Sequence, residues 1–176
     1  TDVLIANQVV DHDKIRRLGA LNRRGDVKVC VDNERNVRDL SEIAESQGTQ
    51  IGVLIEVDTS MGRAGVRSNE QAVELAKLAV SLPGVRFRGV MSHQHLTEFT
   101  DTESRVLTAR EFIQICLDAK AAIEEAGIPV ELVSSGETFS YDAASQMGTA
   151  IEVEGGTYAL MGTRYSYMKE FTVANK

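Results

Sequence analysis

Tryptophan is absent from this 176-residue chain, and aromatic residues make up only 5% of it. The core therefore has to be aliphatic, which is feasible because hydrophobic residues reach 43%. No apolar run approaches the roughly 18 residues that a membrane span requires, and the first residues show no signal-peptide pattern. These absences favour an ordinary globular protein of about one domain in length.

Basic residues are scarce as well. The 19 Lys and Arg residues are outnumbered by 26 Asp and Glu residues, which gives a net charge of -7 and a pI near 5.0. Nucleic acids and anionic membranes need a basic face on their partner, so we expect neither as a partner. A small anionic ligand needs only a local basic pocket and remains compatible with this composition.

Cysteine occurs only at Cys30 and Cys116, in a strand-like and a helix-like run. No C-x-x-C pair is present, so a zinc or redox motif has no support. Buried free thiols are typical of proteins from reducing compartments, and we expect a cytoplasmic protein.

Apolar runs of strand length alternate with amphipathic segments along the whole chain. Strict alternation with helical crossovers indicates a parallel sheet with right-handed connections. The pattern fits a doubly wound open sheet or a barrel that lacks two of its units, and the absence of G-x-G-x-x-G after the first strand disfavours a dinucleotide-binding fold. Strands are expected at 3–6, 27–32, 51–57, 87–91, 130–133 and 151–161 (interrupted at 155–157), and helices at 11–21, 36–47, 68–82, 106–125 and 141–147.

Polar residues follow every expected strand, and in parallel α/β folds these positions share one face. The most informative segment is 56–65, Glu-Val-Asp-Thr-Ser-Met-Gly-Arg-Ala-Gly, which follows an apolar strand and places Arg63 between two glycines. An arginine in this place is suited to an anionic or electron-rich ligand. The alternative is an ordinary loop arginine paired with Asp58 or Glu56.

The segment 134–141, Ser-Ser-Gly-Glu-Thr-Phe-Ser-Tyr, precedes a short expected helix. Hydroxyls, a glycine and free N–H groups in this position are typical of an anion cradle, above all for phosphate. An ordinary Ser-rich loop with a helix cap is the alternative, and Glu137 argues slightly against phosphate.

Two histidines, His93 and His95, follow the fourth expected strand. A spacing of two places both on one face of a strand, where they could bind a metal, contact a ring or act as acid or base. A third metal ligand, such as that in H-E-x-x-H, is missing from this stretch. A plain polar strand end is the alternative.

The segment 57–65 resembles the signature Asp-x-Gly-Met-x-Arg-x-Gly of the alanine-racemase-type, fold-type III enzymes, which use pyridoxal 5′-phosphate. The wider pattern is similar to the D-threonine aldolase and D-serine dehydratase-like branch. The supporting segments, in the right order over nearly the whole chain, are 2–10, 52–58, 87–91, 133–138 with Tyr141, and 154–161.

This resemblance implies an α/β fold, a parallel (β/α)8 TIM-type barrel, present here as a partial barrel of about six βα units. Residues 1–176 would form a single domain, with the first two βα units and the C-terminal β-domain of the family absent. The implied function is a pyridoxal-phosphate-dependent lyase, aldolase or dehydratase, acting on D-β-hydroxy-α-amino acids such as D-threonine or D-serine. The alternatives are a racemase of the same fold and a non-catalytic module that binds a phosphate ligand.

The resemblance also assigns cofactor contacts to particular residues. Arg63 matches the arginine that contacts the phenolic oxygen of the cofactor ring, and His93 falls where a side chain stacks on the pyridine face. The role of His95 stays open, because the segment around it departs from the family pattern. The phosphate cup would comprise Ser135, Gly136, Thr138 and Tyr141, with Gly156 and Tyr158 beside the phosphate.

One essential part of such an enzyme is missing. Pyridoxal chemistry needs a lysine amine for covalent attachment, and none of the six lysines follows an expected strand at the ligand face; Lys28 lies at the amino end of its strand. We therefore expect this chain alone to be inactive, with no catalytic residue and no metal ligand of its own. The full-length protein is expected to contain the lysine, to bind a divalent metal and to form a homodimer.

Overall fold

The computed structural model describes residues 2–99, 101–147 and 151–160 of the chain. Strands and helices alternate along these residues, as the sequence predicts. Their bounds are β1 Asp2–Ile5, α1 His12–Asn22, β2 Asp26–Val31, α2 Glu34–Ser46, β3 Ile51–Glu56, α3 Asn69–Ser81, β4 Val85–Ser92, α4 Thr102–Glu125, β5 Leu132–Ser135, α5 Tyr141–Gln146, β6 Ile151–Glu152 and the 3₁₀ helix η1 Thr157–Leu160.

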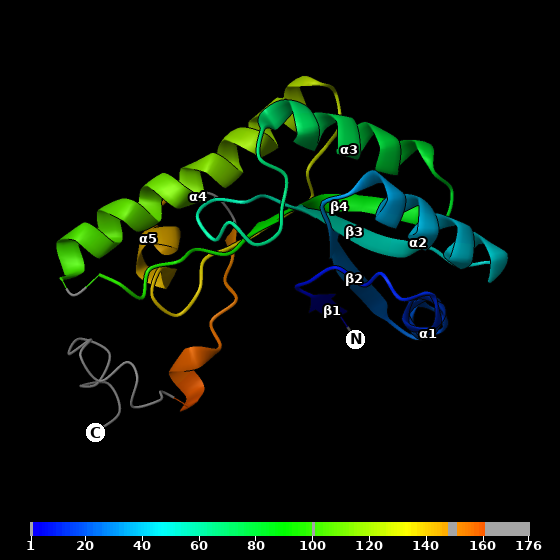
Figure 1. The fold of residues 1–176 in the computed structure, drawn as a ribbon, viewed down its shortest axis with the longest axis horizontal. Coiled ribbons are helices and arrows are strands. Elements are labelled where there is room, and N and C mark those ends of the chain that lie inside the picture. The colour runs from blue at the N-terminus through cyan, green and yellow to red at the C-terminus, as the bar shows by residue number, and fades with distance from the viewer. Residues whose placement is uncertain (1, 100, 148–150, 161–176) are drawn as a thin grey trace.

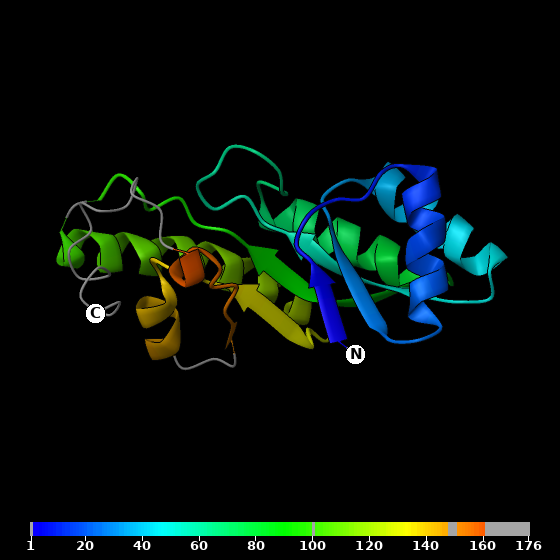
Figure 2. The same cartoon turned by 90° about the horizontal axis from the view of Figure 1, so that it is seen from below.

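All six strands form one parallel sheet in the order β1-β2-β3-β4-β5-β6. Helices α2, α3 and α4 lie along one side of the curved sheet (Figure 1), and from below the strands lie in front of α3 and α4 (Figure 2). A doubly wound sheet would reverse its strand order and carry helices on both faces. The structure is therefore a partial barrel of the α/β class, which confirms the predicted fold class and rules out the open sheet.

Alternation along the strands separates two apolar layers. Val29, Val53 and Ile55 are fully buried in the main core, together with residues of helices α1 to α4. Cys30 and Leu54 have the opposite parity and join a smaller cluster. None of the helices in the described ranges has the length and apolarity that a bilayer span requires.

Helix starts follow local capping rules. The side chains of Asp11, Asn33 and Ser68 accept backbone N–H groups at the starts of α1, α2 and α3. The prediction that the fourth helix begins at residue 106 is wrong by one turn, because the Asp101 carboxylate accepts the N–H of Ser104 at 2.8 Å and starts α4 at Thr102.

The last predicted strand is also shorter than expected. Strand pairing stops at Glu152, and residues 157–160 form the 3₁₀ helix η1 instead of a strand. The N–H of Ala159 donates to the carbonyl of Gly156 at 3.2 Å, a turn bond that replaces sheet pairing beyond the two glycines. Residue 161, the end of that predicted strand, lies outside the described residues.

Candidate functional site

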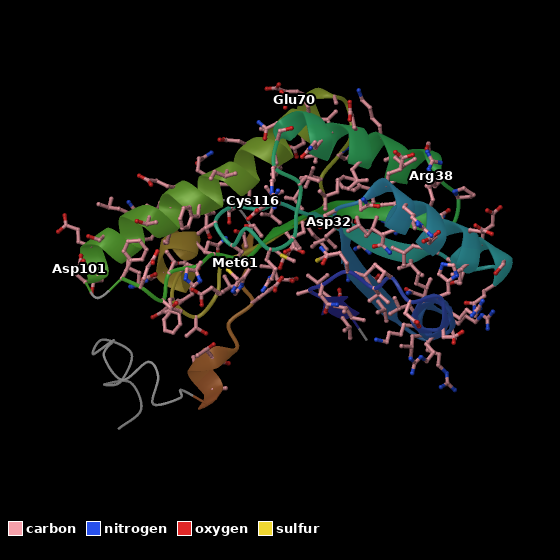
Figure 3. The ribbon with its side chains drawn as sticks, viewed as in Figure 1. Asp32, Arg38, Met61, Glu70, Asp101 and Cys116 are labelled. Atoms are coloured by element: carbon pink, nitrogen blue, oxygen red, sulfur yellow. The ribbon has the colours of Figure 1, made fainter. Side chains whose placement is uncertain are left out.

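The loop between β3 and α3 carries Arg63 to the carboxyl end of the sheet. Its shape is fixed by Asp32 at the end of β2, whose carboxylate accepts the N–H of Gly65 at 2.9 Å. Gly65 has φ +105°, and a Cβ at this position would lie 2.5 Å from the backbone nitrogen of Asp58, so a glycine is required. In Figure 3, Met61 marks this loop and Asp32 lies close to its base.

Among the described residues, Arg63 has one loose ionic contact, with the Glu56 carboxylate at 3.8 Å. The Arg63 side chain is 55% exposed, and an ion pair of this length and exposure contributes little. Asp58, the other expected partner, pairs instead with Arg67 at 3.4 Å. The guanidinium therefore keeps donor capacity for a ligand.

Arg63 lines a cavity of about 300 Å³, at the lower end of the range for ligand sites. Four residues assigned to the cofactor from the sequence meet there from four different loops: Arg63, His93, Thr138 and Gly156. A Cβ built on Gly156 meets nothing within 4 Å, so this part of the wall is open. The remaining lining residues are Ala6, Met91, Glu137, Glu154 and Thr157.

The structure separates the two histidines, because β4 ends at Ser92 and strand alternation does not continue through them. The His93 ring is half-buried and lines the cavity, whereas His95 is exposed and its N–H donates to Ser60 Oγ at 2.8 Å. Burial and the nearby Arg63 charge lower the pKa of His93, so its ring is neutral at neutral pH. Within the described residues, no three His, Cys, Asp or Glu side chains are grouped to hold a metal.

Ser135 is not among the residues that line the cavity in the described part of the chain, and it belongs to a buried hydroxyl–amide network. Its Oγ is 2.8 Å from Ser92 Oγ and accepts a hydrogen bond from Gln94 Nε2 at 3.1 Å. Gln94 Oε1 in turn accepts from Ser140 Oγ at 3.3 Å. Ser135 therefore supports the loop after β5 through its side chain.

Two hydrogen bonds tie the loop after β5 to the loop after β6. The Gly136 carbonyl accepts the N–H of Glu154 at 2.9 Å, and Thr138 Oγ1 accepts the N–H of Tyr158 at 3.2 Å. Gly136 has φ +113°, and a Cβ there would lie 3.1 Å from that of Ala144. These contacts join the two segments that the sequence assigns to phosphate binding.

The two tyrosines assigned to the phosphate are both exposed in this structure. Tyr141 begins α5 and is 52% exposed, while Tyr158 in η1 is 63% exposed. Neither residue is among those that line the cavity in the described part of the chain. Tyr158 contributes through its backbone N–H to Thr138.

Two buried carboxyl groups, Glu56 and Glu137, and the half-buried Glu154 lie at this end of the sheet. Burial raises the pKa of all three, because a carboxylate loses solvation there. Gln8 Nε2 donates to Glu56, and Ser134 Oγ donates to Glu154 at 2.6 Å. The carboxyls of Glu56 and Glu154 are therefore partly satisfied.

Glu137 differs from the other two carboxyls. Its side chain is buried, with the residue only 6% exposed, and its Oε1 atom has no hydrogen-bond partner within the described residues. A hydrogen bond from the N–H of Phe139 favours the ionised form, but burial dominates and raises the pKa of Glu137 to about 7. The Glu137 backbone N–H donates to Ser140 Oγ at 2.8 Å, which fixes the residue in place.

Sequence reasoning did not assign Glu56 or Glu154 to the site, although a signal existed. Glu56 has the same parity along β3 as the inward residue Leu54, and Glu154 has the same parity as Glu152 at the end of β6. Period-two alternation along β3, and along the expected strand at 151–154, therefore predicts both carboxyls on the ligand face. Glu137 was noted only as arguing slightly against phosphate.

A family model described as "Alanine racemase, N-terminal domain" matches residues 6–160. Two characterised relatives are similar over most of the chain. It is 37% identical to 3-hydroxy-D-aspartate aldolase of Paracoccus denitrificans (strain Pd 1222), over 93% of this chain and 43% of that protein. It is 32% identical to D-threo-3-hydroxyaspartate dehydratase of Delftia sp. (strain HT23), over 90% of this chain and 42% of that protein.

Among solved structures, D-threonine aldolase from Filomicrobium marinum superposes with a TM-score of 0.90 and 33% identity. The match covers 95% of this chain and 45% of that one. The chain thus spans less than half the length of the relatives that it matches.

Proposed function

Because the chain belongs to the alanine racemase N-terminal domain family, we propose that its cavity binds pyridoxal 5′-phosphate. We further propose that the complete protein is a lyase, an aldolase or dehydratase, acting on D-β-hydroxy-α-amino acids such as D-threonine or D-serine. One observation carries the proposal: Arg63, His93, Thr138 and Gly156 come from four separate loops and line one cavity.

The residues present fit this cofactor. Thr138 and Thr157 bring hydroxyls and Gly156 an open stretch of backbone, a set suited to a phosphate group.

Each residue has a separate task in this proposal. Arg63 would bind the phenolic oxygen of the ring, and His93 would contact the pyridine ring as a neutral imidazole. Thr138 and Gly156 would hold the phosphate, while Ser135 and Gly136 position the loop that carries Thr138. When bound, pyridoxal phosphate supplies an electron sink for the charge that develops on the substrate.

The lysine that holds the cofactor covalently would come from outside residues 1–176. Of the lysines that the structure describes, Lys28 is buried at the amino end of β2 and pairs with Asp2 and Asp26, while Lys14, Lys77 and Lys120 lie on helices. Residues 1–176 would be the third to eighth units of the barrel, completed in the full protein by two further units and a C-terminal β-domain. A divalent metal, a homodimer and a cytoplasmic location belong to the same proposal.

The test uses the complete protein with D-threonine and 3-hydroxy-D-aspartate. An aldolase releases glycine and an aldehyde, a dehydratase releases ammonia and a 2-oxo acid, and a racemase inverts Cα and yields the epimer. We expect one of the first two outcomes, together with a visible absorbance band on addition of pyridoxal phosphate. Residues 1–176 alone should give no turnover. Absence of the band in the complete protein would refute the proposed cofactor, and racemisation alone would refute the lyase.

A further inference from the structure

The side chain of Gln94 is buried between the loop after β4 and the loop after β5. The residue is 2% exposed, and it is not among those that line the cavity in the described part of the chain. Its amide nitrogen donates to Ser92 Oγ at 2.9 Å and to Ser135 Oγ at 3.1 Å. Its amide oxygen accepts from Ser140 Oγ at 3.3 Å. Both N–H groups and the oxygen of this amide therefore have partners.

The buried amide joins two loops that meet at the cavity. His93, the neighbour of Gln94 in sequence, lines the cavity and would contact the cofactor ring under the proposed function. Thr138, assigned to the phosphate, lines the same cavity from the loop after β5. Since the amide contacts Ser135 and Ser140, it is bonded to this loop on both sides of Thr138.

The loop that carries Arg63 is attached to the same segment after β4. Thr59 Oγ1 donates to the carbonyl of His93 at 3.4 Å. The N–H of His95 donates to Ser60 Oγ at 2.8 Å. The segment after β4 therefore contacts the Arg63 loop through its backbone and the phosphate loop through its buried amide.

We infer that Gln94 is a positioning residue that fixes the ring-binding loop and the phosphate-binding loop relative to each other, so that one rigid ligand reaches both. The inference rests on the proposed function. Gln94 acts through His93 and Thr138 and not by contact with the ligand. Loops that are held in place before the ligand arrives lower the cost of binding, because they need not be ordered by it.

Apolar packing supports the two loops separately from the amide. Leu96 and Phe139, one from each loop, are buried in a second hydrophobic cluster with residues of α4 and α5. The hydroxyls of Ser92 and Ser135 lie 2.8 Å apart and would keep each other as partners without Gln94. Loss of the amide should therefore leave both loops folded, but less firmly fixed relative to each other.

The experiment compares three probes on the complete protein, stripped of cofactor. Pyridoxine 5′-phosphate has an alcohol in place of the aldehyde and cannot attach to a lysine. Pyridoxine and inorganic phosphate report on the ring and phosphate subsites one at a time. The product of the two separate Kd values, divided by the Kd of the linked probe, is an effective concentration that measures how well the two subsites are placed for one ligand.

Gln94→Met keeps the length of the side chain and removes its hydrogen bonds. It should weaken binding of pyridoxine 5′-phosphate about tenfold, and binding of the two separate probes by less than about threefold. If one separate probe lost as much affinity as the linked probe, Gln94 would shape a single subsite and the inference would be wrong. Unchanged binding of the linked probe would also overturn it and leave the proposed function standing. Failure of wild type to bind pyridoxine 5′-phosphate would overturn both.

Gln114→Met is the matched control, because Gln114 is an exposed glutamine of α4 that donates to Asp118 at 2.8 Å. All three affinities should equal those of wild type. Gln94→Asn keeps the amide but shortens its reach by one methylene, so its effective concentration should fall between those of wild type and Gln94→Met. This variant decides the question if Gln94→Met fails to fold, since a wild-type value for Gln94→Asn would overturn the inference.

Discussion

Charged side chains are paired at the amino end of the sheet but only incompletely paired at its carboxyl end. At the amino end, Lys28 contacts Asp2 and lies 3.1 Å from Asp26. Arg88 joins Asp26 at 2.8 Å to Glu131 at 2.7 Å. Each of these charged groups has an opposite charge within hydrogen-bond distance.

At the carboxyl end the balance is incomplete. Arg63 lies 3.8 Å from Glu56, and Glu137 keeps an unpartnered Oε1 within the described residues. Burial raises the pKa of the carboxyls at this end, whereas at the other end Arg88 and Arg86 lower the pKa values of Asp26 and Glu131. Charges that neutralise one another stabilise the strands, while incompletely paired charges in a cavity are those a ligand can use.

The largest effect on activity should come from replacing Arg63. In the complete protein, Arg63→Gln should lower kcat/KM about 100-fold, because a donor directed at the ligand is lost. The unfolding free energy should change by less than ~0.5 kcal/mol, since the side chain is 55% exposed and loosely paired. Steady-state kinetics and urea titration measure the two quantities.

Arg67→Gln is the matched control for Arg63, because it lies on the same loop, is 69% exposed and pairs with Asp58. Its kcat/KM should stay within a factor of about three of wild type. Equal losses in the two variants would mean that the loop, and not the Arg63 guanidinium, determines activity.

The second largest effect should be a loss of stability when Arg105, which joins α4 to the loop after β5 and to α5, is replaced. Arg105 is fully buried and donates to the Phe139 carbonyl and to both oxygens of Asp142. Arg105→Met should lower the unfolding free energy by about 3 kcal/mol, because a buried carbonyl and a carboxylate lose their partner.

Arg110→Met serves as the control for Arg105, since Arg110 also joins α4 to α5 but donates to Gln146 at the surface. It should cost less than ~0.5 kcal/mol. Thermal or urea unfolding measures both variants. Similar losses of unfolding free energy would contradict the claim that burial makes the Arg105 contacts more stabilising than those of Arg110.

The third effect is a dependence of stability on pH. The pKa of Glu137 rises from 4.5 to about 7 on folding, so the unfolded chain ionises first and stability is lost as pH rises from 4.5 to 7. Glu137→Gln should therefore be more stable than wild type by about 3 kcal/mol at pH 8 and equal to it near pH 4. Urea titrations at both pH values test this.

The exposed Glu98→Gln is the control for Glu137, and its difference from wild type should not change with pH. A constant difference for Glu137→Gln would show that its carboxyl is already neutral at pH 8 or solvated. A gain in stability from a neutral side chain fits a residue retained for binding at a cost in stability.

Much of the fold could be predicted because its causes are local. Helix caps at Asp11 and Ser68, and the alternation of strands with helices, need only neighbouring residues. Pairing in chain order then brings the loops with Arg63 and His93 to one edge of the sheet. The placement of Lys28 away from the cavity also followed from its position at the start of a strand.

The orientation of individual side chains depended on distant partners. Ser135 contacts Ser92 and Gln94, which lie 43 and 41 residues away in sequence, and this buried network engages its hydroxyl. Tyr158 follows a turn that replaces the expected strand. The incomplete hydrogen bonding of Glu137 arises from the packing of several loops, so it could not be predicted from composition or residue spacing.

The smallest effect should come from the amino end, where the charges are balanced. Arg88→Met should lower the unfolding free energy by about 1 kcal/mol at pH 7, since Asp26 keeps Lys28 and Glu131 keeps Arg86. The lowered pKa values of Asp26 and Glu131 mean that this contribution exists above their ordinary range and is lost as pH falls through the lowered values.

The difference between wild type and Arg88→Met should therefore shrink below about pH 4 and increase at low salt. Binding of pyridoxine 5′-phosphate should be unchanged, because the amino end lies a full strand length from the cavity. The exposed Arg35→Met, which loses a 3.9 Å contact with Asp39, is the control and should change stability by less than ~0.5 kcal/mol. If Arg88→Met altered binding as strongly as Arg63→Gln, the two ends of the sheet would be coupled, and their division into a structural and a functional end would be wrong.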